Sequence, residues 1–109
     1  MDLVDVIYGL SLGFPASEDF RLTSQITRAV VSVPANIAEG QARSTRRDFA
    51  NFLMMAKGSL NETETLLTVA VRQHFVTEVD AMPAFRLASE VSKMLTVLRR
   101  NLLGGRDAG

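Results

Sequence analysis

Cysteine and tryptophan are absent from this sequence of 109 residues. Without cysteine the chain can form no disulfide, no thiolate nucleophile and no zinc site built on thiolates. Its single histidine, His74, has no second histidine with which to form a ferritin-like carboxylate centre, which needs Glu-x-x-His units on two facing helices. We therefore expect no metal site and no cofactor.

Long apolar runs are also missing. Apolar residues make up 47% of the sequence, yet no run approaches the roughly 20 residues of a membrane helix. The acidic start of the chain lacks the basic residues that open a secretory signal. These features predict a cytoplasmic protein with no membrane partner, made of one domain over residues 1–103 and a flexible tail over residues 104–109.

Charge of one sign is not in excess either, because the formal net charge is zero. This balance argues against a surface built wholly for nucleic acid. The distribution is uneven, however: residues 1–20 hold four acids and no base, and residues 21–57 hold six bases against two acids. Most of the bases are arginines, which favour planar contacts to carboxylate or phosphate. They fit a solvated surface with ion pairs between subunits, or a contact with phosphates.

Helical spacing of apolar residues dominates the chain and predicts four helices. The first covers residues 3–12 and ends at Gly13-Phe14-Pro15, since glycine caps a helix and proline stops one. The second covers residues 18–39, with Ser17 as its N-cap and Gly40 at its close.

The second helix contains a proline, Pro34, which lacks the N–H that would bond the Val30 carbonyl. A helix accepts such a residue when it bends or when a partner satisfies the freed carbonyl. We therefore expect one helix with a kink near Val30–Pro34, and not two separate helices.

The third and fourth helices begin at similar signals. Thr45 and Asp48 fit a capping box, as do Thr77 and Asp80, with Pro83 expected in the first turn of the fourth helix. The third helix extends to about residue 73, and its apolar seam recurs at spacings of four and three residues. The seam consists of Phe49, Leu53, Ala56, Leu60, Thr63, Leu67 and Ala70. The seam of the fourth consists of Phe85, Ala88, Val91, Leu95, Leu98 and Leu102.

Four helices with short links predict an all-α fold, an antiparallel up-down-up-down four-helix bundle. Each of the last two helices carries a second apolar stripe, with Phe52, Met55, Ser59, Leu66 and Val69 on one and Leu87, Met94 and Val97 on the other. One copy of the chain cannot cover faces this broad, so we expect the chain to self-associate.

The search for chemistry points to arginines. No Ser, His and Asp set is suggested by spacing, and Glu62 and Glu64 fall on different helix faces, so we expect no enzyme. Arg43, Arg46 and Arg47 lie in the turn before the third helix, where N–H groups at a helix start and arginines together can hold a phosphate. We take them as candidate nucleic-acid or anion ligands.

The sequence also resembles a known protein family. The chain is similar to the four-helix-bundle proteins encoded by intervening sequences of bacterial 23S ribosomal RNA genes, and that family is similar to the accessory protein of diversity-generating retroelements. The resemblance covers about residues 3–103, and its signature is the segment with Pro34, Asn36, Glu39 and Gly40. The matching residues are Ile7-Tyr8, Phe14-Pro15, the runs 22–26 and 28–40, Asp48-Phe49, Phe52-Leu53, Ala56, Gly58-Ser59-Leu60, Glu62, Glu64-Thr65 and Lys93-Met94-Leu95.

The resemblance implies a non-enzymatic bundle that assembles into a ring-like homo-oligomer, a homopentamer being favoured. The chain departs from the family in two ways. Its first helix starts about two to three turns later than is usual, which should weaken the bundle or leave part of the third or fourth helix uncovered. It is also neutral where the retroelement accessory protein is strongly basic. Three hypotheses follow: a scaffold that binds a protein partner, an accessory module that binds RNA or DNA, and a small-molecule or catalytic bundle.

Overall fold

The computed structural model describes residues 1–104 and contains four α-helices and one short 3₁₀ turn. These residues form no strand, which confirms the all-helical prediction. The elements are α1 (Asp2–Ser11), η1 (Ala16–Glu18), α2 (Leu22–Gln41), α3 (Arg46–Arg72) and α4 (Glu78–Leu103).

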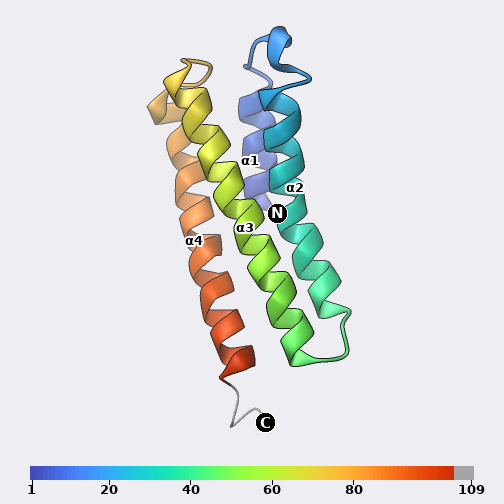
Figure 1. Cartoon of the computed structure of the whole chain (residues 1–109). Helices are drawn as coiled ribbons and strands as arrows, with labels where there is room; N and C mark the ends of the chain where they lie inside the picture. The colour runs from blue at the N-terminus through green and yellow to red at the C-terminus, as the bar shows by residue number, and fades with distance from the viewer. Residues whose placement is uncertain (105–109) are drawn as a thin grey trace.

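The helices lie alongside one another in an elongated molecule (Figure 1). The turn between α2 and α3 lies at one end, and the connections from α1 to α2 and from α3 to α4 lie at the other. The helix α1 packs against α2 and α4. With 10 residues it is less than half as long as α3 with 27, so it runs beside only the half of the molecule that holds the connection from α3 to α4.

The connection between α1 and α2 differs from the prediction. Ser17 does not cap α2, because residues Ala16–Glu18 form a separate 3₁₀ turn and α2 begins only at Leu22. Arg21 interrupts the helical path with φ −120° and ψ −105°. The Glu18 carboxylate accepts the Leu22 N–H at 3.4 Å, so a side chain four residues upstream serves the free donor of the first turn.

The helix α2 continues through Pro34 and Gly40 and ends at Gln41. It is therefore one helix, as expected, but it does not close at Gly40. Gly40 is buried, and a Cβ atom built there would lie 2.8 Å from both Phe49 Cδ1 and Phe52 Cβ. Glycine at this position lets the end of α2 approach the start of α3 closely.

Threonine caps open α3 and α4. The Thr45 hydroxyl accepts the Asp48 N–H at 3.1 Å, and the Thr77 hydroxyl accepts the Asp80 N–H at 3.0 Å, which confirms both N-caps. The prediction that Pro83 lies in the first turn of this helix is wrong, because α4 starts at Glu78 and Pro83 is its sixth residue, in the second turn. It leaves the Val79 carbonyl without its helical donor, at a residue that is well exposed to water.

The core follows the seam of α3. Its buried residues are Ala50, Leu53, Ala56, Leu60, Thr63, Leu67 and Ala70. Phe49 packs only partly buried against this core, and Ala50 takes the fully buried place beside it. The predicted seam is therefore confirmed from Leu53 onward. In α4, Ala88 and Leu95 are buried, but Leu98 keeps 39% of its surface exposed.

The turn between α3 and α4 contains the single histidine. His74 has φ 64°, a left-handed conformation that glycine adopts more easily. Its N–H donates to the Val71 carbonyl at 3.0 Å, and the Phe75 N–H donates to the Ala70 carbonyl at 2.9 Å. These two bonds form a Schellman motif that closes α3. The Phe75 ring then lies 6.1 Å from the ring of Phe14, which ties this turn to the segment after α1.

None of the helices within residues 1–104 is long and apolar enough to cross a membrane. The predicted tail at residues 104–109 falls, apart from Gly104, outside the described residues.

Candidate functional site

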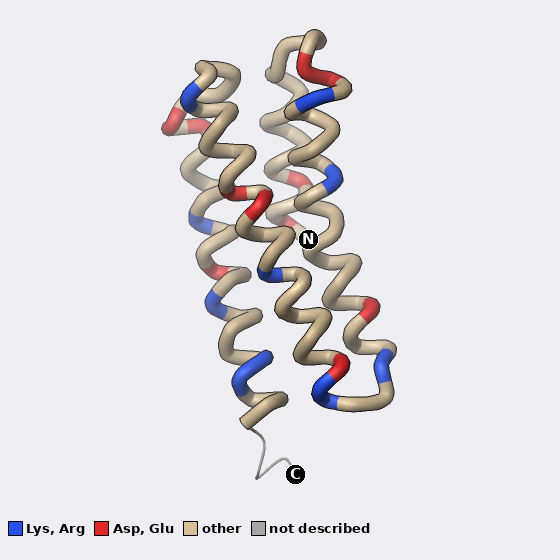
Figure 2. Tube along the Cα trace, viewed as in Figure 1, with Lys and Arg blue, Asp and Glu red and all other residues tan. Residues whose placement is uncertain are grey.

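The three arginines proposed as an anion site lie around the turn between α2 and α3. Arg43 follows the end of α2, and Arg46 and Arg47 are the first two residues of α3. All three are exposed. The structure thus brings them to one end of the molecule, beside the N–H groups that open α3 (Figure 2).

Arg43 is engaged within the chain. Its Nη2 atom donates to Glu39 Oε2 at 3.0 Å, and its guanidinium carbon lies 4.7 Å from the centre of the Phe52 ring. Both members of the ion pair are about half exposed, so the pair contributes little stability, about 0.5 kcal/mol. Within residues 1–104, Arg46 and Arg47 form no ion pair or side-chain hydrogen bond, which leaves their guanidinium groups accessible to a partner.

The signature residues have local structural roles. The Asn36 amide donates to the Ser32 carbonyl at 2.8 Å, Glu39 holds Arg43, and Gly40 allows the close contact with α3. The Ser32 and Ser59 hydroxyls are hydrogen-bonded to each other and join α2 to α3 near the middle of both helices. This segment therefore fixes how α2 lies on α3, and through it where the turn with the arginines is held.

The two halves of the molecule carry opposite charge. We define the basic half as residues 32–59 and 91–104, and the acidic half as residues 1–31 and 60–90; Figures 1 and 2 show them as the two ends of the long axis. The basic half has seven bases and two acids, a net side-chain charge of +5. The acidic half has four bases and nine acids, a net charge of −5. The neutral total therefore conceals a strong separation of charge over a length of 50 Å.

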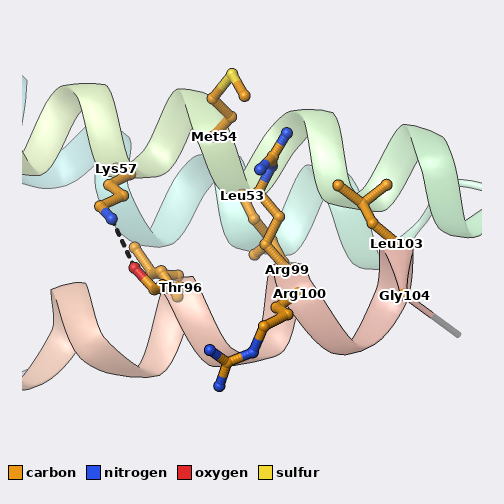
Figure 3. A pocket seen from close by; sticks show the side chains of 9 residues that line it. Leu53, Met54, Lys57, Thr96, Arg99, Arg100, Leu103 and Gly104 are labelled. Atoms are coloured by element: carbon orange, nitrogen blue, oxygen red, sulfur yellow. Dashed lines mark hydrogen bonds between the residues drawn. The ribbon is translucent and has the colours of Figure 1, made fainter.

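A groove between α3 and α4 adds cations to the basic half. It has a volume of about 570 Å³ and an apolar lining that includes Leu53, Leu95 and Leu103. Lys57 Nζ donates to Thr96 Oγ1 at 2.6 Å across the groove. The Arg99 side chain extends toward α3, and the Arg100 side chain points away from it (Figure 3).

Arg99 also has an unsatisfied donor. Its Nε atom is buried and has no hydrogen-bond partner within residues 1–104. A buried donor without a partner is rare and costs free energy. No carboxylate lines the groove, whereas three cationic residues do: Lys57, Arg99 and Arg100. The sequence did not group these three, because only the packing of α4 on α3 brings Lys57 beside Arg99 and Arg100.

An apolar stripe on α4 is covered in one half of the molecule and open in the other. Leu87, Val91, Met94 and Leu98 follow at spacings of four, three and four residues, which places them on one helix face. Leu87, in the acidic half along which α1 runs, and Val91, at the boundary between the halves, are both partly buried. Met94 and Leu98 lie in the basic half and are 66% and 39% exposed. Part of α4 is thus uncovered in the basic half.

The arrangement offers no centre for metal chemistry within the described part of the chain. No group of three or more His, Asp and Glu side chains lies close enough together there to hold a metal ion. His74 sits exposed in its turn, and the groove that it helps to line has only one carboxylate, that of Glu78. What the geometry does offer is a cationic surface with apolar patches beside it.

Comparison with known proteins identifies relatives of this fold. Residues 1–97 match the model of the family described as 23S rRNA-intervening sequence proteins. A crystal structure of a protein of unknown function from the S23 ribosomal protein family of Bacteroides thetaiotaomicron is similar, with a TM-score of 0.83 and 27% sequence identity over 91% of this chain and 93% of that one. No curated protein matches the sequence. The match over most of its length shows that the chain belongs to the family of 23S rRNA-intervening sequence proteins.

Proposed function

We propose that this chain is a non-enzymatic scaffold: an up-down-up-down four-helix bundle that assembles into a ring-like homo-oligomer, a pentamer being favoured, and presents its surface to a protein partner. The observation that carries this proposal is a cluster of exposed apolar side chains on α4. Met94, Val97 and Leu98 are all exposed over two adjacent turns of one helix. When another chain covers a cluster of this kind, the burial of apolar surface lowers the free energy of the assembly.

Solution mass tests the proposal. Light scattering at micromolar concentration should give a multiple of the 11.9 kDa of one chain. Replacing Met94 and Leu98 by glutamate should reduce the mass to that of one chain while the helical circular dichroism is kept, because both side chains are already partly exposed. A wild-type chain that is monomeric throughout this concentration range contradicts the proposal.

Pro34 has a part in the same proposal. We propose that it bends α2 near Val30–Pro34 and that this bend sets the shape that the assembled chains need. Pro34→Ala restores an N–H donor and removes the cause of the bend. The variant should change the mass of the assembly more than its helical content. If the variant assembles as the wild type does, the proposed role of Pro34 in assembly is wrong.

A second candidate function is contact with the phosphate backbone of RNA or DNA. The net charge of +5 on the basic half and the accessible Arg46 and Arg47 favour it. Binding that rests on phosphate contacts weakens steeply with salt. Replacing Arg43, Arg46 and Arg47 by alanine should abolish such binding, measured by the polarisation of a labelled RNA over a salt series.

The matched control for that test lies in the acidic half. Arg72→Ala and Arg86→Ala each remove an exposed arginine from a helix without touching the basic half, so they should leave the affinity unchanged. A loss per arginine removed that is the same in the triple variant and in these controls would show a general charge effect. Unchanged affinity in the triple variant would reject the arginine cluster as the site.

A further inference from the structure

The outer side of α1 carries a second uncovered stripe. Met1, Asp5, Tyr8 and Leu12 follow at spacings of four, three and four residues, and all four are exposed, Leu12 at 88%. This spacing places them on one helix face. The opposite face of α1 holds the buried Leu3 and Ile7. We call this stripe the α1 surface.

A second exposed surface lies on α4, in the other half of the molecule. Lys93, Met94, Val97, Leu98 and Asn101 line a depression of about 400 Å³ on α4. It spans roughly two turns of helix, about 12 Å at 1.5 Å per residue. We call it the α4 surface. Apart from its one charged group, Lys93, it is largely apolar, and it continues the stripe that α1 accompanies in the acidic half.

Charge selects which of these surfaces can meet. Residues 1–20, which hold the α1 surface, contain four acids and no base. Residues 91–104, which hold the α4 surface, contain three bases and no acid. Two α4 surfaces or two α1 surfaces would bring like charges together, whereas an α1 surface facing an α4 surface joins opposite charges. Such complementarity steers association and suppresses the wrong pairing.

We infer that the α1 surface of one copy docks on the α4 surface of a second copy of this chain. The inference rests on the proposed self-association and names its interface. The two surfaces lie in different halves of the molecule, so one copy cannot satisfy itself. The contact joins two different patches, and each copy has one of each. Contacts of this kind either close into a ring or grow into a filament, and the proposed ring requires that they close.

Complementary variants test the pairing. The first variant, Tyr8→Glu with Leu12→Glu, disables the α1 surface and leaves the α4 surface intact. The second, Met94→Glu with Val97→Glu, does the reverse. All four side chains are at least 44% exposed, so both variants should fold. A control is Val79→Glu, which adds one glutamate to an exposed position of α4 outside both surfaces.

Each variant alone should have the mass of one chain in light scattering, and the Val79→Glu control should assemble as the wild type does. An equal mixture of the two variants should contain complexes of two chains and nothing larger, because each complex has one working contact. The inference is wrong if the first variant still assembles, or if the mixture stays monomeric while the wild type assembles. A monomeric wild type would instead overturn the proposed function itself.

Exchanging the two charges tests the pairing a second time, with substitutions that should weaken association without abolishing it. Asp5→Lys and Lys93→Asp should each weaken association by about two- to fivefold, the range expected for an exposed ion pair. The chain carrying both changes should recover most of the loss, because the pairing is restored with its signs exchanged. If the losses of association free energy in the two single variants simply add in the double variant, Asp5 and Lys93 do not meet across the interface. The proposed docking of the α1 surface on the α4 surface is then wrong.

Discussion

The acidic and the basic half of this molecule share α2, α3 and α4, but only the acidic half has a fourth helix, α1, over its core. In the acidic half α1 runs beside α2 and α4, and the core residues Leu3, Ile7 and Leu67 are each 1% exposed. In the basic half only α2, α3 and α4 are present, and Met94 and Leu98 face solvent. In the acidic half four helices enclose the core, although the outer side of α1 is itself exposed, whereas in the basic half three helices leave part of α4 open.

Charge follows the same division. The acidic half carries a net charge of −5 and the basic half +5. An open apolar surface within a region of one sign of charge repels its own copies and attracts a surface of the opposite sign. The difference between the halves therefore shows that a chain with no net charge can still carry a strong separation of charge along its length.

Truncation of a core leucine in each half should give the largest effects and compare the packing of the halves directly. Leu67 and Leu53 are both 1% exposed in α3, one in the acidic and one in the basic half. Each replacement by alanine should lower the free energy of unfolding by about 2–5 kcal/mol. We expect Leu67→Ala to cost more, since three helices close on a cavity more easily than four. Urea denaturation of the two variants measures this, and equal losses would mean that the basic half is packed as tightly as the acidic one.

The seam of α3 shows what the sequence could predict. Apolar spacing identified the buried face from Leu53 to Ala70, because a long helix repeats its contact with the core at every turn. The N-caps at Thr45 and Thr77 could also be predicted from the sequence, since each depends on two residues that are only three positions apart.

Other features depended on contacts that spacing does not reveal. The start of α2 was misjudged because Arg21 breaks the helix and Glu18 serves as the cap from a separate turn. The engagement of Arg43 by Glu39 follows the four-residue rule, but its contact with Phe52 needs the folded turn. Lys57 and Arg99 share a groove only because α4 packs on α3 in one register.

Two glycines within the basic half should respond in opposite directions to the same change. Gly40→Ala places a Cβ 2.8 Å from Phe49 and Phe52 and should destabilise the chain by about 1–3 kcal/mol. Gly58 is the matched control, because it lies inside α3 with open space around its Cα atom. Gly58→Ala should stabilise by about 0.5–1 kcal/mol. Thermal unfolding of both variants checks the signs, and a neutral Gly40→Ala would show that α2 does not need this close approach.

The two threonine caps allow a comparison of the opposite ends of the molecule. Thr45 opens α3 in the basic half, and Thr77 opens α4 in the acidic half. Each replacement by alanine should cost about 1 kcal/mol, because one N–H in the first turn loses its acceptor. Equal losses in denaturant unfolding are expected. A much smaller loss for Thr45→Ala would indicate that the turn between α2 and α3 frays in the isolated chain.

The smallest effect is expected at His74. Its φ of 64° is a strained conformation for a side chain with a Cβ atom. His74→Gly should raise the free energy of unfolding by about 0.5 kcal/mol, the relief of this strain less the added freedom of the unfolded chain. A calorimetric midpoint that falls instead would mean that the imidazole makes contacts worth more than the strain.

Crosslinking between copies tests the docking of the α1 surface on the α4 surface most directly, because the chain has no cysteine of its own. One chain carries Tyr8→Cys and the other Val97→Cys, two exposed positions on the two surfaces. With a short bis-maleimide reagent, the mixture should form predominantly crosslinked pairs of unlike chains, and each chain alone should form few. Like chains crosslinked as readily as unlike chains, or no crosslink while the chains assemble, would contradict the account.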